Sequence, residues 1–223
     1  PSPELVAKTL LVAPAVAGAL TAIPAYLVAK RLAGRVPALF AAVVLMLLPG
    51  TFLQRTLTGF ADHNGVEPLF QVTAVFATVV ALAVAREDRP IWELVTAREW
   101  GDLRRSMTYS VLAGVAMAAY IYAWPPGVLL VGVFGVFAVL QAVSDHASGR
   151  PPEHTGFVVA VTGLTVALLT LVGIDTTSFS ATSLSLVQPV VGGSVAVGGV
   201  GLAWLSRQFE GRTFDNEWVD ENG

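Results

Sequence analysis

Seven long apolar stretches, separated by short polar segments, follow one another along the chain. A helix that crosses the hydrocarbon core of a membrane needs about 20 predominantly apolar residues. We therefore expect an all-α fold, a polytopic transmembrane helical bundle with about seven spans, near residues 7–29, 36–54, 66–85, 107–124, 127–144, 155–174 and 190–206. The sequence WPPG (Trp124–Gly127) divides the fourth span from the fifth, because prolines interrupt a helix.

The last span carries the glycine-rich sequence GGSVAVGGVG (Gly192–Gly201). Small residues spaced four apart let two helix backbones approach closely in lipid, so this pattern predicts helix packing. A phosphate-binding loop is the alternative for such glycines, but no strand precedes them, as that motif requires.

Composition supports a membrane-embedded chain. Hydrophobic residues make up 54% and charged residues 13% of the sequence, whereas soluble domains carry about 25% charged residues. The absence of cysteine excludes disulfides and thiolate metal sites. The net charge of −3 gives no reason to expect nucleic acid as a partner, whereas membrane lipids are expected to surround the bundle. Because the chain starts at Pro1 and ends in a polar tail, we expect it to be a piece of a larger polypeptide.

Lysine and arginine occupy alternate connections between the spans, which predicts orientation because basic loops stay in the cytoplasm. The basic connections hold Lys30, Arg31 and Arg35, then Arg86, Arg89, Arg98, Arg104 and Arg105, then Arg150, and finally Arg207 and Arg212. The other connections hold only Arg55. In the cell membrane, residues 55–65, the WPPG turn and residues 175–189 are thus expected on the extracytoplasmic side.

Two basic connections suggest further features. Residues 86–105 are typical of an amphipathic segment at the membrane interface, with Trp92 and Trp100 as anchors. His146 and His154 lie in another basic connection with two prolines between them, and they favour a solvated loop over a metal site.

The first extracytoplasmic segment contains a cluster of polar residues at the start of the third span. Asp62 and Asn64 could place oxygen atoms on one Mg²⁺ or Mn²⁺ ion, with His63 or Glu67 as weaker further ligands. Glu67 could instead stabilise the positive end of the following helix. The alternative is a plain polar loop, in which Asn-Gly forms a turn and Asp62 caps a helix.

This segment resembles a known family. PGTFLQRTLTGFADHNGVEPLF is similar to the second acidic motif of the catalytic subunit of oligosaccharyltransferase, especially the archaeal AglB type. The preceding run, with Leu-Thr-x-Ile before a tyrosine and a basic turn, is also similar. Downstream, YIYAWPPGVLLVGVFGVFAVL resembles the Trp-Gly-Gly turn of the family, and SLSLVQP (183–189) resembles its fifth external loop. These similarities occur in the same order over residues 7–204.

The resemblance implies a fold and an activity. The bundle would be part of a larger GT-C type membrane domain, and the enzyme would transfer a glycan from a dolichyl phosphate or diphosphate carrier to Asn in Asn-x-Ser/Thr acceptors. Asp62 would be the catalytic metal anchor for Mn²⁺ or Mg²⁺, with Asn64 as a second ligand. Substrate contacts would come from Arg55 and Trp124. The lipid-linked oligosaccharide and the acceptor protein would be the partners.

The chain departs from the family pattern at two positions. Asn64 stands where an acid or histidine is expected, and Leu186 stands where the fifth external loop has a catalytic glutamate. The first acidic motif would precede this chain and a large soluble domain would follow it, so the fragment alone is not expected to be active. Two alternatives remain: an inactive paralogue or scaffold, and a secondary transporter with an ion site at Asp62.

Overall fold

The computed structural model describes residues 2–48, 50–58, 65–87 and 89–208. All elements in these ranges are helical, which confirms the all-α prediction. They are α1 (Pro3–Ala33), α2 (Arg35–Leu47), α3 (Thr51–Arg55), α4 (Glu67–Ala85), α5 (Ile91–Thr96), α6 (Trp100–Ala123), the 3₁₀ turn η2 (Pro125–Gly127), α7 (Val128–Ala147), α8 (Glu153–Val172) and α9 (Val187–Gln208).

Six helices within the described ranges are long and apolar enough to cross a membrane: α1, α4, α6, the η2–α7 pair, α8 and α9. They match six of the seven expected spans and identify an integral membrane protein. The stretch expected as a span at residues 36–54 differs, because it divides into α2 of 13 residues and the five-residue α3. Helix α2 ends at Leu47, and Leu48 is already extended. Pro49 follows Leu48, and the residue before a proline is driven out of helical geometry.

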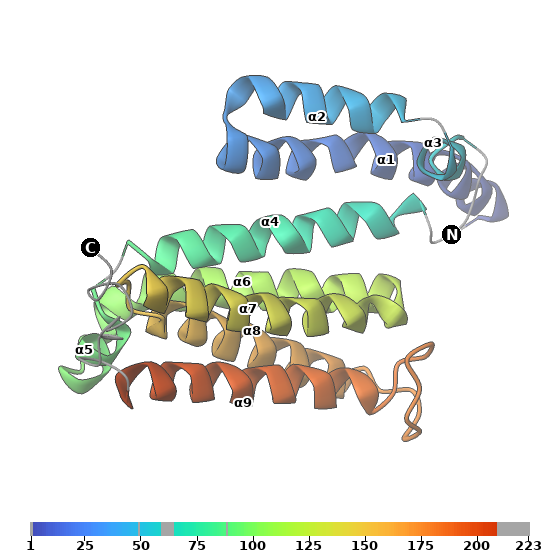
Figure 1. The fold of residues 1–223 in the computed structure, drawn as a ribbon. Coiled ribbons are helices and arrows are strands. Elements are labelled where there is room, and N and C mark those ends of the chain that lie inside the picture. Colours follow the sequence, from blue (N-terminus) through green and yellow to red (C-terminus); the bar gives the residue numbers. More distant parts are fainter. Residues whose placement is uncertain (1, 49, 59–64, 88, 209–223) are drawn as a thin grey trace, which may run out of the picture.

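The long helices lie side by side and alternate in direction (Figure 1). The α1–α2 turn, the α4–α6 connection with α5, the α7–α8 connection and the last turn of α9 gather at one end, on the left of Figure 1. These are the basic connections identified in the sequence, and we call this the basic end. The α2–α4 connection, the η2 turn and the α8–α9 loop gather at the opposite end.

Helices α8 and α9 meet backbone to backbone along a line of small residues. A Cβ placed on Gly163 would lie 2.7 Å from the nitrogen of Ala196, and a Cβ on Gly199 would lie 2.5 Å from the nitrogen of Ala160. Gly156 and Gly192 are equally enclosed. No side chain fits at these positions, which confirms that the glycine-rich sequence serves helix packing.

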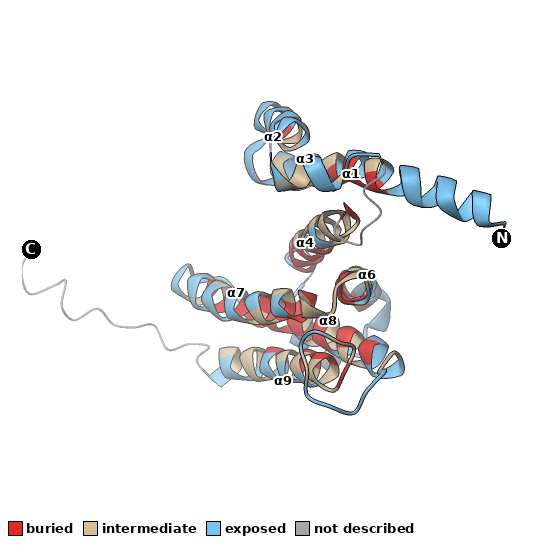
Figure 2. Cartoon of the chain, turned by 90° about the vertical axis from the view of Figure 1, so that its right-hand side faces the viewer, coloured by how far each residue is buried: buried red, intermediate tan, exposed pale blue. Residues whose placement is uncertain are grey.

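The bundle consists of a well-buried part and an outlying hairpin (Figure 2). The core lies between α4 and α6–α9, where Ile121, Val158 and Val166 are fully buried. The α1–α2 hairpin lies beyond α4, which separates it from α6–α9 in Figures 1 and 2. Most of the hairpin's apolar side chains are exposed, as expected for surfaces that contact lipid or further membrane helices.

Candidate functional site

The predicted metal residues Asp62, His63 and Asn64 lie outside the residues that the structure describes. Both flanks of this segment are described, however, and both are packed against α1. A Cβ on Gly18 of α1 would lie 2.5 Å from the Cβ of Thr56, which follows α3. On the other flank, a Cβ on Gly65 would lie 3.0 Å from the Cβ of Pro14 and 3.0 Å from the carbonyl oxygen of Arg55.

These contacts place both described flanks of the segment against α1. Gly65 is buried, and α4 begins two residues later at Glu67. This start of α4 lies at the end opposite the basic end (Figure 1).

Glu67 is the first residue of α4 and is half-buried. A carboxylate there is favoured by the partial positive charge of the helix N-terminus, and no side chain caps this end. Glu67 thus lies at the same end of the bundle as the second connection there, the η2 turn (Figure 1).

Trp124 precedes η2 and is half-buried, with its ring centroid 6.1 Å from that of Tyr120 and the two rings tilted by 46°. The Tyr120 ring lies beneath the turn, because a Cβ on Gly127 would be 2.7 Å from its Cε1. Sequence reasoning named Trp124 but missed Tyr120. Its position one helical turn before Trp124 was a signal for this pairing.

Arg55, the other predicted substrate contact, is the last residue of α3 and is exposed. It lies at the same end as Glu67 and Trp124, and its carbonyl faces Gly65. The structure therefore brings the described candidates Arg55, Glu67 and Trp124 to one end of the bundle. Their substrate-binding and metal-binding roles remain predictions.

Within the described ranges no three histidine or acidic side chains are grouped closely enough to hold a metal ion. Glu67 is the only predicted donor among the described residues. The other three predicted donors, Asp62, His63 and Asn64, fall in the segment between Thr58 and Gly65. Oxygen and imidazole donors of this kind suit a divalent cation. Among the described residues, the candidate metal site therefore has one carboxylate, that of Glu67, and the other predicted donors lie outside the described residues.

The α8–α9 loop is folded around its own polar groups. Ser185 and Gln188 are buried, and the Gln188 Oε1 accepts hydrogen bonds from the Ser185 backbone nitrogen at 2.8 Å and its hydroxyl at 3.3 Å. The Gln188 Nε2 donates to the carbonyl of Ser183 at 2.8 Å. Leu186, at the position compared with a catalytic glutamate, is half-buried beside this network.

The basic end contains polar chemistry that sequence reasoning placed in solvent. Asp145, Glu153 and His154 are buried, so the interpretation of this connection as a solvated loop was wrong for these residues, whereas residues 147–151 are exposed. Asp145 accepts hydrogen bonds from Arg86, which follows α4, at 3.0 and 3.2 Å, from Gln141 at 2.9 Å and from Thr155 of α8 at 3.1 Å. The partners come from three separate parts of the chain, so adjacent residues in the sequence could not reveal this network.

A second ion pair at this end involves the interface segment. Glu153 Oε2 lies 3.8 Å from Nε of Arg207, and the Arg207 guanidinium lies over the Trp92 ring at 4.7 Å. Trp92 and Trp100 are about half-exposed, as expected for interface anchors. These contacts hold α5 and the end of α9 together.

Comparison with known proteins identifies the family. Residues 5–210 match the family described as oligosaccharyl transferase STT3, N-terminal. The chain is 54% identical over 218 residues to the dolichyl-monophosphooligosaccharide–protein glycotransferase AglB of Haloferax volcanii, covering 98% of this chain and 21% of that protein. The chain thus spans about a fifth of the relative's length.

Solved oligosaccharyltransferase structures from Archaeoglobus fulgidus share the fold. One, tethered to an acceptor peptide with an NVT sequon, gives a TM-score of 0.80 at 26% identity over 94% of this chain and 24% of that one. Another, AglB with an inhibitory peptide and a dolichol-phosphate, gives a TM-score of 0.80 at 25% identity and covers 100% of this chain and 24% of that one. A complex with Zn and sulfate gives a TM-score of 0.78 at 25% identity and covers 94% of this chain and 25% of that one.

The family match covers nearly all described residues. The chain therefore belongs to the oligosaccharyl transferase STT3 family and corresponds to part of its N-terminal membrane region.

Proposed function

We propose that the protein containing this chain is an oligosaccharyltransferase that moves a glycan from a dolichyl phosphate-type carrier to Asn of an Asn-x-Ser/Thr acceptor. The observation that carries the proposal is the 54% identity to AglB across almost the whole chain. The acceptor peptide and the dolichol-phosphate in the A. fulgidus structures support both substrate classes. The comparisons give no support to the transporter alternative.

The reaction is assigned to the end that holds Arg55, Glu67 and Trp124. This end carries a half-buried carboxylate at a helix start, an exposed guanidinium and an aromatic pair. The asymmetry of charge between the two ends supports placing the reaction on the extracytoplasmic side, because the opposite end carries the other described arginines and Lys30. Glycan and acceptor would therefore meet outside the cytoplasm.

Asp62 and Asn64 would hold a Mn²⁺ or Mg²⁺ ion, with His63 and Glu67 as further candidates. When bound, the ion would act as a Lewis acid that fixes the carboxylates and compensates negative charge. The structure of a relative in complex with Zn and sulfate supports metal binding by such a protein. Glu67 would hold its negative charge at the start of α4, and Arg55 would face the anionic phosphate of the carrier.

The test uses the full-length protein in detergent, with a lipid-linked glycan and a peptide that contains Asn-x-Thr. Peptide glycosylation would be measured with and without Mn²⁺ for the wild type, Asp62→Ala and Glu4→Ala. Glu4 is a suitable control, because it is an acid on an exposed turn of α1, where it pairs with Lys8 at 2.7 Å.

We expect metal-dependent transfer by the wild type and by Glu4→Ala, and a loss of at least about 100-fold in Asp62→Ala. That result would also show that Asn64 and Leu186 are compatible with activity. If the wild type transfers nothing while H. volcanii AglB works in the same assay, the inactive-paralogue alternative holds instead.

A further inference from the structure

The α1–α2 turn, residues 30–37, forms an exposed cationic corner of the basic end. Lys30, Arg31 and Arg35 are exposed, and none forms an ion pair with a residue that the structure describes. The sequence contains no acidic residue between Glu4 and Asp62. This turn therefore presents three positive charges without a neighbouring negative charge on its own helices.

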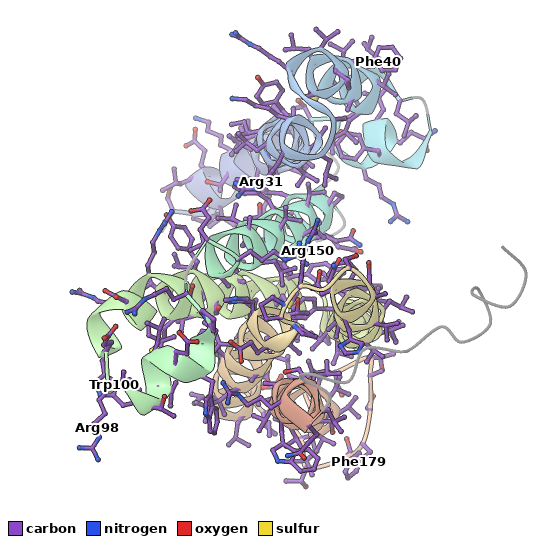
Figure 3. All side chains as sticks on the ribbon, turned by 60° about the vertical axis from the view of Figure 1, so that its left-hand side comes forward. Arg31, Phe40, Arg98, Trp100, Arg150 and Phe179 are labelled. Atoms are coloured by element: carbon purple, nitrogen blue, oxygen red, sulfur yellow. The ribbon has the colours of Figure 1, made fainter. Side chains whose placement is uncertain are left out.

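The α4–α6 connection at the same end provides a contrast. Arg89 is paired there with Glu99 and Asp102, and Arg105 lies 3.1 Å from Glu87. Arg89 and Arg105 are therefore neutralised within the chain, whereas Arg98 and Arg104 form no ion pair with a described residue. Figure 3 shows Arg31 on the α1 side and Arg98 at a separate corner, so the two basic regions are distinct surfaces.

The charges of the α1–α2 turn occur together with exposed apolar side chains. Leu32 is 72% exposed and Val36 is 78% exposed. Phe40, one turn further along α2 and labelled in Figure 3, is 70% exposed. A surface that places guanidinium groups at the end of an apolar helical hairpin matches the boundary between lipid headgroups and acyl chains.

Position adds an electrostatic argument. Lys30 and Arg31 lie in the last turn of α1, where cations are favoured, and Lys30 also lies over the Tyr26 ring at 5.9 Å. Arg35 is different, because it starts α2, whose first turn has no acidic residue. A cation at the positive end of a helix is unfavourable, so an external anion near Arg35 would relieve this repulsion.

We propose that the α1–α2 turn binds the phosphate group of an anionic membrane phospholipid, with Arg31 and Arg35 on the phosphate and with Leu32 and Val36 in the acyl region. Guanidinium groups bind phosphate through paired hydrogen bonds, and basic residues beside a membrane helix attract anionic headgroups. The exposed apolar neighbours favour a lipid over a soluble anion. This inference does not depend on the transfer reaction.

The bound lipid would serve to hold the outlying hairpin. Helices α1 and α2 are joined to the buried part of the bundle through α4, whereas their outer surfaces are exposed. A headgroup that bridges Arg31 and Arg35 would connect the end of α1 to the start of α2. Anionic lipid would thereby stabilise the hairpin against which both flanks of the acidic motif pack.

The test uses native mass spectrometry of the full-length protein in detergent, titrated with equal amounts of phosphatidylglycerol and phosphatidylcholine of the same acyl chains. The test variant is Lys30→Gln/Arg31→Gln/Arg35→Gln. The matched control is Arg89→Gln/Arg105→Gln, which removes paired arginines from the same end. Retained phosphatidylcholine and the elution volume on size exclusion check that each variant is folded.

We expect the wild type and the control to retain phosphatidylglycerol preferentially, and the ratio of the two lipids to fall on the order of 10-fold or more in the triple variant. The preference of the wild type should also weaken as salt increases. Equal retention of both lipids by the wild type, or an undiminished preference in a folded triple variant, would overturn the proposal. Displacement of the lipid by millimolar inorganic phosphate would likewise overturn the proposal, because the turn would then bind phosphate without a need for the lipid.

Discussion

The two ends of the bundle both contain acidic side chains, but they hold them in different environments. At the basic end, Asp145 is buried and accepts hydrogen bonds from Arg86, Gln141 and Thr155. At the opposite end, Glu67 is half-buried and makes no ion pair with any described residue. A carboxylate whose oxygens already accept hydrogen bonds from the protein has a structural role. A carboxylate at a helix start without an ion-pair partner can still interact with a ligand.

The largest effect on stability is expected when the network at the basic end is broken. Asp145→Ala would leave Arg86, Gln141 and Thr155 without their shared acceptor. The free energy of unfolding should fall by about 2–3 kcal/mol, toward the lower limit for a buried pair because the Arg86 side chain is 37% exposed. Thermal unfolding of the full-length protein would measure this loss, and transfer activity per folded molecule should stay unchanged.

The exposed pair Arg89–Glu99 provides the control for that experiment, because both side chains are about half-exposed. Glu99→Ala should change the free energy of unfolding by less than about 1 kcal/mol. An equal loss of stability in both variants would contradict the distinction between buried and exposed pairs at this end.

A change at the opposite end should have the reverse pattern. Glu67→Gln keeps the size of the side chain and removes its charge beside the acidic motif. We expect transfer to fall about tenfold, while stability changes by less than about 1 kcal/mol through the lost interaction with the helix N-terminus. Metal-dependent activity and the unfolding midpoint would be measured on the same sample. Full activity in this variant would show that the charge of Glu67 acts only on the positive end of α4.

The smallest effect is expected where α9 meets the interface segment. Arg207→Lys keeps the charge near Glu153 but removes the planar group that lies over Trp92. The expected loss is about 0.5 kcal/mol, because cation–π contacts at partly exposed sites contribute little. The unfolding midpoint would be compared with that of Trp92→Leu. A loss as large as that of Asp145→Ala would show that this contact belongs to the structural network.

The sequence predicted the long helices well, because hydropathy and proline positions report directly on membrane spans. The expected span 66–85 became Glu67–Ala85, and the WPPG break separated α6 from α7 as expected. Helix α6 begins at Trp100, seven residues before the expected start at 107. The hydropathy pattern missed these residues because the first turns of the helix contain charged side chains. Pro49 indicated that residues 36–54 divide into two helices, but the uniform apolar composition of this stretch favoured one continuous span.

The polar contacts were less predictable. Asp145 meets Arg86 across 59 positions, and Glu153 meets Arg207 across a similar separation, so no local pattern records either pair. The candidate site was predicted from the segment 55–68 together with Trp124. The structure adds its anchoring on α1 and the contact of Trp124 with Tyr120. The roles of Asp62, His63 and Asn64 stay predictions.

The order of the connections also bears on Leu186. The structure places three connections at the end opposite the basic end, and the α8–α9 loop is the third of them. If the first external loop precedes this chain, as the resemblance implies, the α8–α9 loop is the fourth and not the fifth. A glutamate would then not be expected at position 186, and Leu186 would give no indication of lost activity.

The short helix α2 has a consequence for the surrounding bilayer. Its 13 residues extend about 20 Å, whereas the hydrocarbon core of a bilayer is about 30 Å thick and α4 extends about 28 Å. A membrane accommodates a helix that is too short by thinning around it, at a cost of fractions of a kcal/mol per Å. The hydrophobic mismatch would thin the bilayer beside α3, so that a lipid headgroup there would meet the protein at a lower level than elsewhere on its perimeter.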